Sequence, residues 1–478
     1  MREKKPLVQK LKEYNTTMIP MHMPGHKRNL ALSGKEGYLT ALGADCDITE
    51  IAGFDNLAEP EDVLFELKNR AARLWKSDEA YPLVNGSTCG VLAGIYATVP
   101  QGGCVLAARN CHKSVYNGLQ LVNAKVTYLT PEWDETLGCY GELSSETVEI
   151  ALEKVRDVKL VVVTSPTYEG SISDIEGICR AAHAKGVPVM VDSAHGAHLG
   201  FGGFPKGAVE CGADIVVHSL HKTLPCLTQT AMLHRKGNLV SGQALQNAIN
   251  MFQTSSPSYL LLASIDGCIG LLEEQGEMLF GAWEEAIFEF CQGARLLQNI
   301  RMHDGKGKDP GKLILFTGGT DLTGPALAEL LRKEYCIELE MAAERYGLAM
   351  TGMGDTKGSL ACLLKALFAI DERCHKIPEK KTVYPVLPPV RLPIGEALER
   401  KSEELFIEEA VGRIAAEHLW AYPPGIPVVV AGEEITKETA TYLLEKQSQG
   451  VALHRTNGSC KERVLLKVVQ AGGQGRNL

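Results

Sequence analysis

Two residues whose side chains could take part in catalysis lie at the ends of apolar segments in the middle of the chain. Asp192 ends the run 187–192, and Lys222 lies just beyond the run 215–217. Short β-branched runs without alternation are typical of parallel strands that are covered on both faces. In open α/β sheets, ligands bind outside the carboxyl ends of such strands. A lysine amine there can form a Schiff base and a carboxylate can keep a pyridine nitrogen protonated, which is what pyridoxal phosphate chemistry needs.

Each of these residues also has an ordinary structural explanation. Asp192 could cap a helix, and Lys222 could be a solvated side chain. Four histidines lie in the same two segments and could instead bind a metal ion. His195 and His198, however, lie in a glycine-broken loop rather than on one helical face, and the chain has no Cys-x-x-Cys pair. We therefore favour pyridoxal phosphate and expect no metal.

Other predicted elements bring polar residues to the ends of strands. Gly86 would let the backbone approach a ligand, while Ser87 and Thr88 supply hydroxyls at a helix start that favours anions. A serine or threonine N-cap explains this pattern about as well. His112 follows the apolar run 104–108 and could stack on a flat heteroaromatic ring or cap a helix.

Strands alternate with helices at intervals of roughly thirty residues, which predicts a doubly wound, mostly parallel α/β sheet. A returning strand is expected over 228–234, and a long helix runs from 260 towards 300. A smaller α/β domain follows, with strands at 312–316 and 337–341 around a helix at 325–335. The expected domains are an N-terminal segment 1–60, a large cofactor domain 61–285, a small α/β domain 286–385 and a C-terminal domain 386–478.

Composition narrows the class of protein. The chain has 478 residues, 45% of them hydrophobic, and a net charge of −9. Without a basic run, nucleic acid is an improbable partner. No apolar segment is long enough to cross a bilayer and no signal core follows the N-terminus, so a cytoplasmic protein without a membrane partner is expected. The 14 cysteines have no framework spacing, and Cys89, Cys111 and Cys226 are expected to serve packing.

Motifs in a fixed order carry a resemblance to a known family. They are His22-Met23-Pro24-Gly25-His26-Lys27, Asp47-Ile48-Thr49-Glu50, Asn85-Gly86-Ser87-Thr88, Arg109-Asn110-x-His112-Lys113-Ser114, Ser165-Pro166-Thr167-Tyr168-x-Gly170, Asp192-x-Ala194-His195-Gly196-Ala197-His198, Ser219-x-His221-Lys222-Thr223-Leu224-Pro225, the cluster 254–259, and Pro423-Pro424-Gly425-x-Pro427. Over nearly its whole length the chain resembles the bacterial ornithine/lysine/arginine decarboxylases of the pyridoxal phosphate fold-type I (aspartate aminotransferase-like) superfamily. It resembles their short form, which lacks an N-terminal wing domain.

The resemblance implies pyridoxal 5'-phosphate as the cofactor. Lys222 would form the internal aldimine, Asp192 would pair with the pyridine nitrogen, and His112 would stack on the ring. The other residues implied at the cofactor are Ser87, Thr88, Ala194, His195, Ser219, His221 and, from a partner subunit, Ser255. A homodimer with shared active sites, or a higher homo-oligomer, is therefore expected.

The implied reaction is decarboxylation of arginine, lysine or ornithine to agmatine or a diamine, in polyamine metabolism. The electrons left by carbon dioxide would flow into the ring, and His221 or Lys222 would return a proton to Cα. Glu433 is the implied contact of the substrate's distal cation. Two positions depart from the family's pattern: Ser193 stands where the family has the glutamate of Asp-Glu-Ala-His-Gly, and Ala431-Gly432-Glu433 stands for the usual Pro-Gly-Glu. Because the second departure affects the register of the substrate loop, Glu434 stays an alternative to Glu433.

The alternatives to decarboxylation are another reaction of the same fold and a protein without enzymatic activity. An aminotransferase or aldolase of this fold would use both Lys222 and Asp192, although Arg391 is a poor candidate for holding an α-carboxylate. A cofactor-binding scaffold without activity is the non-enzymatic alternative, which the presence of both Lys222 and Asp192 disfavours. Release of carbon dioxide with a basic amine would indicate decarboxylation, a keto acid would indicate transamination, and neither product would indicate the scaffold.

Overall fold

The computed structural model describes residues 6–17, 23–24, 27, 38–303, 305, 307–379, 381–382, 387–422, 426–448, 451–456, 458–460 and 463–470. It divides into two compact units. The first comprises Met1–Thr98, Met190–Glu284 and Gly352–Gly354, and the second Val99–Val189, Glu285–Thr351 and Asp355–Leu478. Some motif residues lie outside the described ones, namely His22, Gly25, His26, Pro423, Pro424 and Gly425.

The first unit contains a sheet in the order β1-β9-β8-β7. Its strands are β1 (Glu79–Leu83), β7 (Val189–Asp192), β8 (Ile215–Ser219) and β9 (Ala231–Arg235). β7 and β8 are parallel and buried throughout, as their unbroken apolar runs predict. β9 pairs antiparallel with both β8 and β1, which confirms the returning strand.

Glycines bring helix α4 (Gly86–Thr98) close to this sheet. A Cβ atom added to Gly90 would lie 2.8 Å from Leu83 and 2.9 Å from Val217. Only a residue without a side chain therefore lets α4 pack directly on β1 and β8. Its first turn, with Ser87 and Thr88, is thereby held near the ends of these strands.

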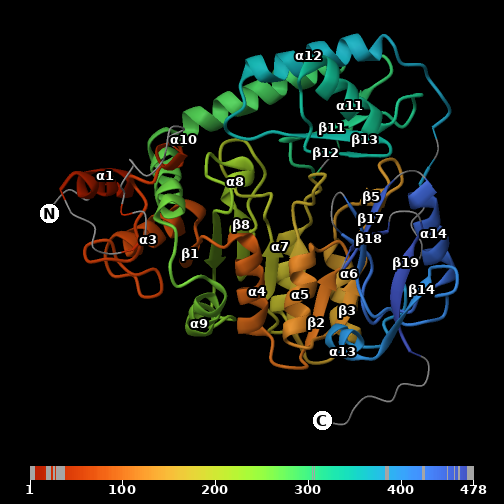
Figure 1. The fold of residues 1–478 in the computed structure, drawn as a ribbon, viewed down its shortest axis with the longest axis horizontal. Coiled ribbons are helices and arrows are strands. Elements are labelled where there is room, and N and C mark those ends of the chain that lie inside the picture. Colours follow the sequence, from red (N-terminus) through yellow and green to blue (C-terminus); the bar gives the residue numbers. More distant parts are fainter. Residues whose placement is uncertain are drawn as a thin grey trace. The chain divides into compact units, whose positions relative to one another are not determined.

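The N-terminal helix α1 (Leu7–Thr17) packs into the first unit. Leu7 and Leu11 share an apolar cluster with Leu64 of α3 (Val63–Trp75) and with Tyr259 of the long helix α10 (Tyr259–Ala294). Figure 1 shows α1 and α3 beside the start of α10. The remaining elements of this unit are α2 (Tyr38–Ala41), α8 (Leu220–Thr223) and α9 (Gly242–Phe252).

The second unit contains the parallel strands β6 (Val158–Thr164), β2 (Cys104–Ala108) and β3 (Lys125–Leu129), in the order β6-β2-β3. The helices that precede and follow β6 begin at side-chain caps. Ser144 caps α6 (Ser145–Lys154) and Asp174 caps α7 (Ile175–His183), each by accepting a backbone N–H. α5 (Lys113–Leu121) follows β2, and β4 (Trp133–Asp134) and β5 (Cys139–Tyr140) form a short hairpin.

A smaller antiparallel sheet in the same unit has the order β10-β11-β13-β12. Its strands are β10 (Arg301–Met302), β11 (Lys312–Phe316), β12 (Met341–Ala343) and β13 (Tyr346–Met350). Helices α11 (Gly324–Tyr335) and α12 (Lys357–Asp371) lie on one side of it (Figure 1). The strand predicted at 337–341 was placed too early, because the chain leaves α11 at the left-handed Cys336 and pairs only from Met341.

The C-terminal part of the second unit has its own apolar core, formed by residues such as Leu419, Leu443 and Leu466. Its elements are α13 (Ile394–Glu399), β14 (Ser402–Phe406), β15 (Leu419–Tyr422), β16 (Pro427–Val429), α14 (Lys437–Ser448), β17 (Ala452–Arg455), β18 (Gly458–Cys460) and β19 (Leu465–Val469). The prediction of a mostly parallel α/β sheet with smaller C-terminal α/β domains is confirmed.

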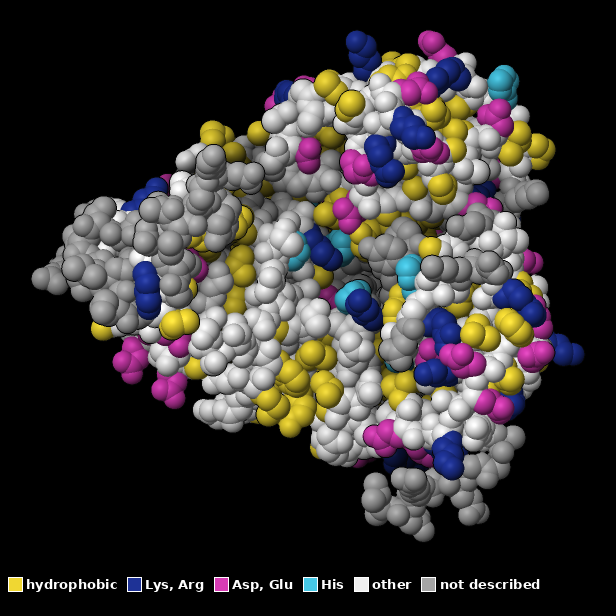
Figure 2. Space-filling view, viewed as in Figure 1, with side chains coloured by type: hydrophobic (Ala, Val, Ile, Leu, Met, Phe, Trp, Pro, Cys, Tyr) yellow, Lys and Arg dark blue, Asp and Glu magenta, His cyan; other side chains and the backbone are white. Residues whose placement is uncertain are grey.

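Basic and acidic side chains alternate over the face of the molecule in Figure 2, without one large region of a single sign. Among the described residues, no helix is both long and apolar enough to cross a membrane. The same residues contain no group of three or more His, Cys, Asp or Glu side chains placed to hold a metal ion.

Two buried histidines should make the first unit sensitive to acid. His218 and His234 lie 5.0 Å apart, centroid to centroid, against Trp75. Burial lowers the pKa of His218 to about 3 and the pKa of His234 well below its usual value. An unfolded chain binds these protons from about pH 6.5 downward, whereas the folded protein does not. The free energy of unfolding should therefore fall below pH 6.5, by about 1.4 kcal/mol per pH unit for each histidine.

Denaturant unfolding of the parent and of His218→Phe between pH 7 and 4.5 checks this expectation. The variant should lose stability less steeply than the parent as the pH falls. Replacing the exposed His183 by glutamine is the matched control, because it removes a histidine from a surface position. Equal slopes for parent and His218→Phe would show that His218 does not resist protonation in the folded state.

Candidate active site

Lys222 lies on α8, the single helical turn that follows β8. The turn is held by a hydrogen bond from Leu220 N to Thr230 O (3.1 Å), and Met353 N donates to Thr223 O (2.9 Å). The Lys222 Nζ atom lies 2.9 Å from Nε2 of His195. The lysine at the end of one strand therefore meets the loop that follows the neighbouring strand.

Asp192 ends β7 and is buried, with 4% of its surface exposed. It pairs in register with Val217 of β8. The following loop stays beside β8, because Ser193 N donates to Val217 O (3.0 Å) and Ser219 N to Ala194 O (3.4 Å). Asp192 Oδ1 accepts from Ala194 N at 3.3 Å, which orients the carboxylate at the strand end.

Two predicted hydroxyl residues also meet. Ser219, at the end of β8, donates through Oγ to Ser87 Oγ at 2.9 Å. Ser87 is in the first turn of α4, where backbone N–H groups and the helix dipole favour an anion. Gly86, with φ +75°, makes the turn into the helix. Thr88 is in the same turn and is exposed, so the structure places both residues at a surface suited to a phosphate group.

Two buried hydroxyls next to these residues indicate that the site fits a polar cofactor. Ser193 Oγ and Thr223 Oγ1 are buried and have no hydrogen-bond partner among the described residues. They follow Asp192 and Lys222 directly in sequence. Buried hydroxyls are normally paired, so a group absent from the structure is a reasonable partner for them. The carboxylate, the amine and the hydroxyls together match the donor set that pyridoxal phosphate requires.

His221 has a defined hydrogen bond to the backbone. Its Nδ1 lies 2.9 Å from Thr230 O. Burial lowers the pKa of His221, and the charge of Lys222 lowers it further. A carbonyl oxygen can only accept, so Nδ1 carries the hydrogen and Nε2 of the neutral ring is an acceptor.

The remaining predicted residues are placed less closely. His112 belongs to the second unit, where it caps α5 by accepting from Ser114 N and contacts Ser114 Oγ at 2.9 Å. Ser255 is exposed in the segment before α10. His198 packs 4.8 Å from the Phe204 ring, centroid to centroid, and so serves the core rather than the strand end. Ring stacking by His112 and a contact from Ser255 in a second subunit stay predictions.

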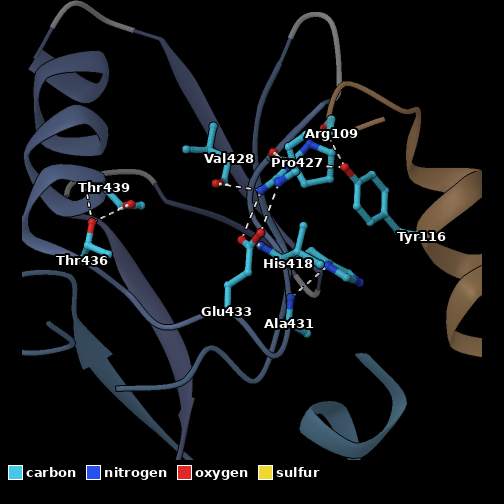
Figure 3. A network of polar contacts seen from close by, with 10 residues as sticks. Arg109, Tyr116, His418, Pro427, Val428, Ala431, Glu433, Thr436 and Thr439 are labelled. Carbon is cyan, nitrogen blue, oxygen red and sulfur yellow. Dashed lines mark hydrogen bonds and ion pairs between the residues drawn. The ribbon is translucent and has the colours of Figure 1, made fainter. Parts of the chain in front are cut away.

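Glu433 lies in a buried ion pair of the second unit. Its Oε1 and Oε2 accept from Nε and Nη2 of Arg109, both at 3.1 Å, and Oε2 also accepts from Val430 N (2.7 Å). The two side chains are 1% and 0% exposed. Figure 3 shows the carboxylate pointing at the guanidinium group. Burial raises the pKa of Glu433, while Arg109 opposes this effect.

Arg109 makes hydrogen bonds to backbone carbonyls as well as to Glu433. It also donates to the carbonyls of Pro427 (2.5 Å) and Val428 (3.1 Å), and Tyr116 Oη donates to Arg109 O at 2.7 Å (Figure 3). A contact between Glu433 and a substrate cation would therefore compete with the hydrogen bonds that the Glu433 carboxylate already accepts from Arg109 and Val430. The alternative, Glu434, is partly exposed and pairs with Arg391 Nε at 2.8 Å.

Sequence reasoning missed the role of Arg109. An arginine directly after an apolar strand was a usable signal, since a charge at that place must be exposed or paired. Its partner Glu433 could not be identified, because the two residues are 324 positions apart.

Comparisons with known proteins cover most of the chain. The model of the Orn/Lys/Arg decarboxylase major domain matches residues 5–324, and that of the Orn/Lys/Arg decarboxylase C-terminal domain matches residues 384–453. The arginine decarboxylase of Halalkalibacterium halodurans is 31% identical, over 91% of this chain and 91% of that protein. The arginine decarboxylase of Bacillus anthracis is 30% identical, with the same two coverages.

A solved structure extends the likeness to the fold. The lysine decarboxylase of Francisella novicida superposes with a TM-score of 0.82 at 20% identity, over 97% of this chain and 81% of that one. At 20% identity this likeness supports the fold alone. The family assignment rests on the two family models and on the arginine decarboxylases, which match most of the sequence. The chain belongs to the Orn/Lys/Arg decarboxylase family and is an amino-acid decarboxylase with the fold-type I architecture.

Proposed function

We propose that this decarboxylase binds pyridoxal phosphate at Lys222 and converts L-arginine to agmatine and carbon dioxide. The observation that carries the proposal is the contact between Lys222 and His195, which brings the lysine to the loop that begins at Asp192. Arginine is preferred over lysine and ornithine because the relatives named arginine decarboxylases match more of the chain, at higher identity, than those named lysine decarboxylases.

The cofactor would supply an aldehyde for covalent attachment and a ring that accepts the electrons left by the departing carbon dioxide. The residues of the chain would hold it at both ends. Asp192, at the end of β7, would keep the pyridine nitrogen protonated. Ser87 and Ser219 would donate to the phosphate at the start of α4, with the helix N–H groups beside them.

Lys222 is the better candidate for returning a proton to Cα. A proton donor must carry a hydrogen on the atom that faces the substrate. The neutral His221 keeps its hydrogen on Nδ1, committed to Thr230 O, and its lowered pKa disfavours a second proton. The amine of Lys222 carries more than one hydrogen, so its contact with His195 Nε2 leaves a hydrogen for the substrate. His221 would then support α8 by anchoring it to Thr230.

We also propose a homodimer in which Ser255 of the partner subunit completes the phosphate site. The exposure of Ser255 is compatible with this role. Mixing Ser255→Ala with Lys222→Ala should then restore about a quarter of the dimeric sites if subunits exchange at random, since each hybrid dimer has one intact site. Absence of any restored activity in exchanging mixtures would contradict shared sites.

Parallel assays of the reconstituted protein with arginine, lysine and ornithine test the reaction and its substrate. We expect carbon dioxide and agmatine in equal amounts from arginine, with kcat/KM at least about tenfold above that for the other two amino acids. Cadaverine or putrescine as the main product would overturn the choice of arginine. Accumulation of a keto acid without carbon dioxide would overturn decarboxylation in favour of transamination.

A further inference from the structure

Two cysteine thiols meet beside the segment that carries Lys222. Cys226 follows α8, and its Sγ lies 3.8 Å from Ser264 O of α10. Cys268 lies one helical turn beyond Ser264, and its thiol is hydrogen-bonded to the thiol of Cys226. Leu227 N donates to Ser264 Oγ at 2.8 Å, which fixes the segment on this turn of α10. The pair thus joins the loop of the reactive lysine to a long helix.

The environments of the two thiols differ in a way that favours oxidation. The hydrogen bond from Cys268 lowers the pKa of Cys226, and the same bond raises the pKa of Cys268. Cys226 is partly exposed, whereas Cys268 is only 3% exposed. A partly exposed cysteine of lowered pKa beside a buried thiol is the arrangement of an attacking cysteine and its resolving partner.

We propose that Cys226 and Cys268 form a reversible disulfide when the protein meets a peroxide, and that this bond slows decarboxylation by displacing Lys222. Formation of the bond is independent of the reaction catalysed, whereas its effect on turnover rests on the proposed function.

The oxidation balances in two steps. The Cys226 thiolate attacks one oxygen of hydrogen peroxide, the O–O bond breaks, and a sulfenic acid and hydroxide form. The Cys268 thiol then attacks the sulfenic sulfur, the S–O bond breaks, and a disulfide and water form. The peroxide is reduced by two electrons, both taken from the thiols. An added dithiol returns them and restores both cysteines.

The structure indicates how the bond would reach the lysine. A disulfide brings its sulfurs to about 2.05 Å, closer than two thiols in a hydrogen bond. Cys226 must therefore move towards α10. It is tied to α8, because Cys226 N donates to Leu224 O (2.8 Å) and Leu224 N to Leu220 O (3.0 Å). A pull on Cys226 should thus shift the short turn that holds Lys222 against His195.

The test uses the full-length holoenzyme with Cys336 and Cys362 replaced by serine, because these two cysteines are exposed and would form bonds between molecules. After treatment with hydrogen peroxide, intact mass should fall by two hydrogen atoms, and peptide mapping without reductant should link Cys226 to Cys268. The kcat should drop by roughly 10- to 100-fold. Dithiothreitol should restore both mass and kcat.

Two variants in the same background act as controls. Cys226→Ser and, separately, Cys268→Ala should keep their kcat through the same treatment and show no such link. The proposal is overturned if the parent gives no link between Cys226 and Cys268, or if the linked protein keeps its full kcat. If the link forms but no amino acid is decarboxylated even before oxidation, the proposed function fails while the oxidation site stands.

Discussion

Replacing Lys222 by alanine is expected to lower kcat by at least about a thousandfold, the scale of losing the group that binds the reacting centre covalently. The group 2.9 Å from its Nζ is the imidazole of His195, which cannot form a Schiff base in its place. Steady-state assays of carbon dioxide release from arginine measure the effect. Lys185→Ala is the matched control, because Lys185 is exposed and should keep the parental rate.

A chemical readout accompanies this prediction. Borohydride reduction of the holoenzyme, followed by peptide mapping, should find the pyridoxyl group on Lys222, and Lys222→Ala should not be labelled at that segment. Turnover of Lys222→Ala at the parental rate would remove the basis of the proposed function. A pyridoxyl group on another lysine would do the same for the site.

Replacing Glu433 by glutamine should destabilise the protein by about 3 kcal/mol, because the buried charge of Arg109 then lacks the opposite charge of the carboxylate. The pair is almost completely inaccessible, so water cannot replace the lost carboxylate. The neutral amide keeps the shape of the side chain, and the loss therefore reports the charge rather than a cavity. Denaturant unfolding at pH 7 measures it.

Glu434→Gln is the matched control for this prediction. Glu434 is the next residue in the chain and also pairs with an arginine, but Arg391 is 55% exposed. Exposed pairs contribute little, so the free energy of unfolding should change by less than about 0.5 kcal/mol. Equal losses for the two variants would show that burial does not decide the strength of the Arg109 pair.

The same two variants separate the candidates for the contact with the substrate's distal cation. If Glu434 makes that contact, Glu434→Gln should raise the KM for arginine while stability is unchanged. If Glu433 makes that contact, Glu433→Gln should raise the KM for arginine even at temperatures at which all of the variant protein is folded. A KM unchanged in both would move the search for the specificity residue away from this turn.

The local sequence was sufficient to predict the buried strands and the turns that follow or precede them. Unbroken apolar runs predicted the buried strands β7 and β8. They also placed Asp192 and Lys222 at the strand ends, because an extended strand crosses the core in a few residues and the residues that follow it emerge at the edge of the sheet. The turn before Ser87 likewise follows from one glycine with a positive φ. The order of the motifs was enough to indicate the family and its fold.

The tertiary structure alone decided which distant residues meet. A glutamate after a proline-rich turn was expected at the substrate, yet packing of the C-terminal strands buries it against Arg109. Cys226 was expected to serve packing only, and its pairing with Cys268 depends on how α10 passes the lysine loop. Periodicity specifies which face of an element is buried but not which partner covers it, because that choice is made by the shapes and charges of segments far apart in the chain.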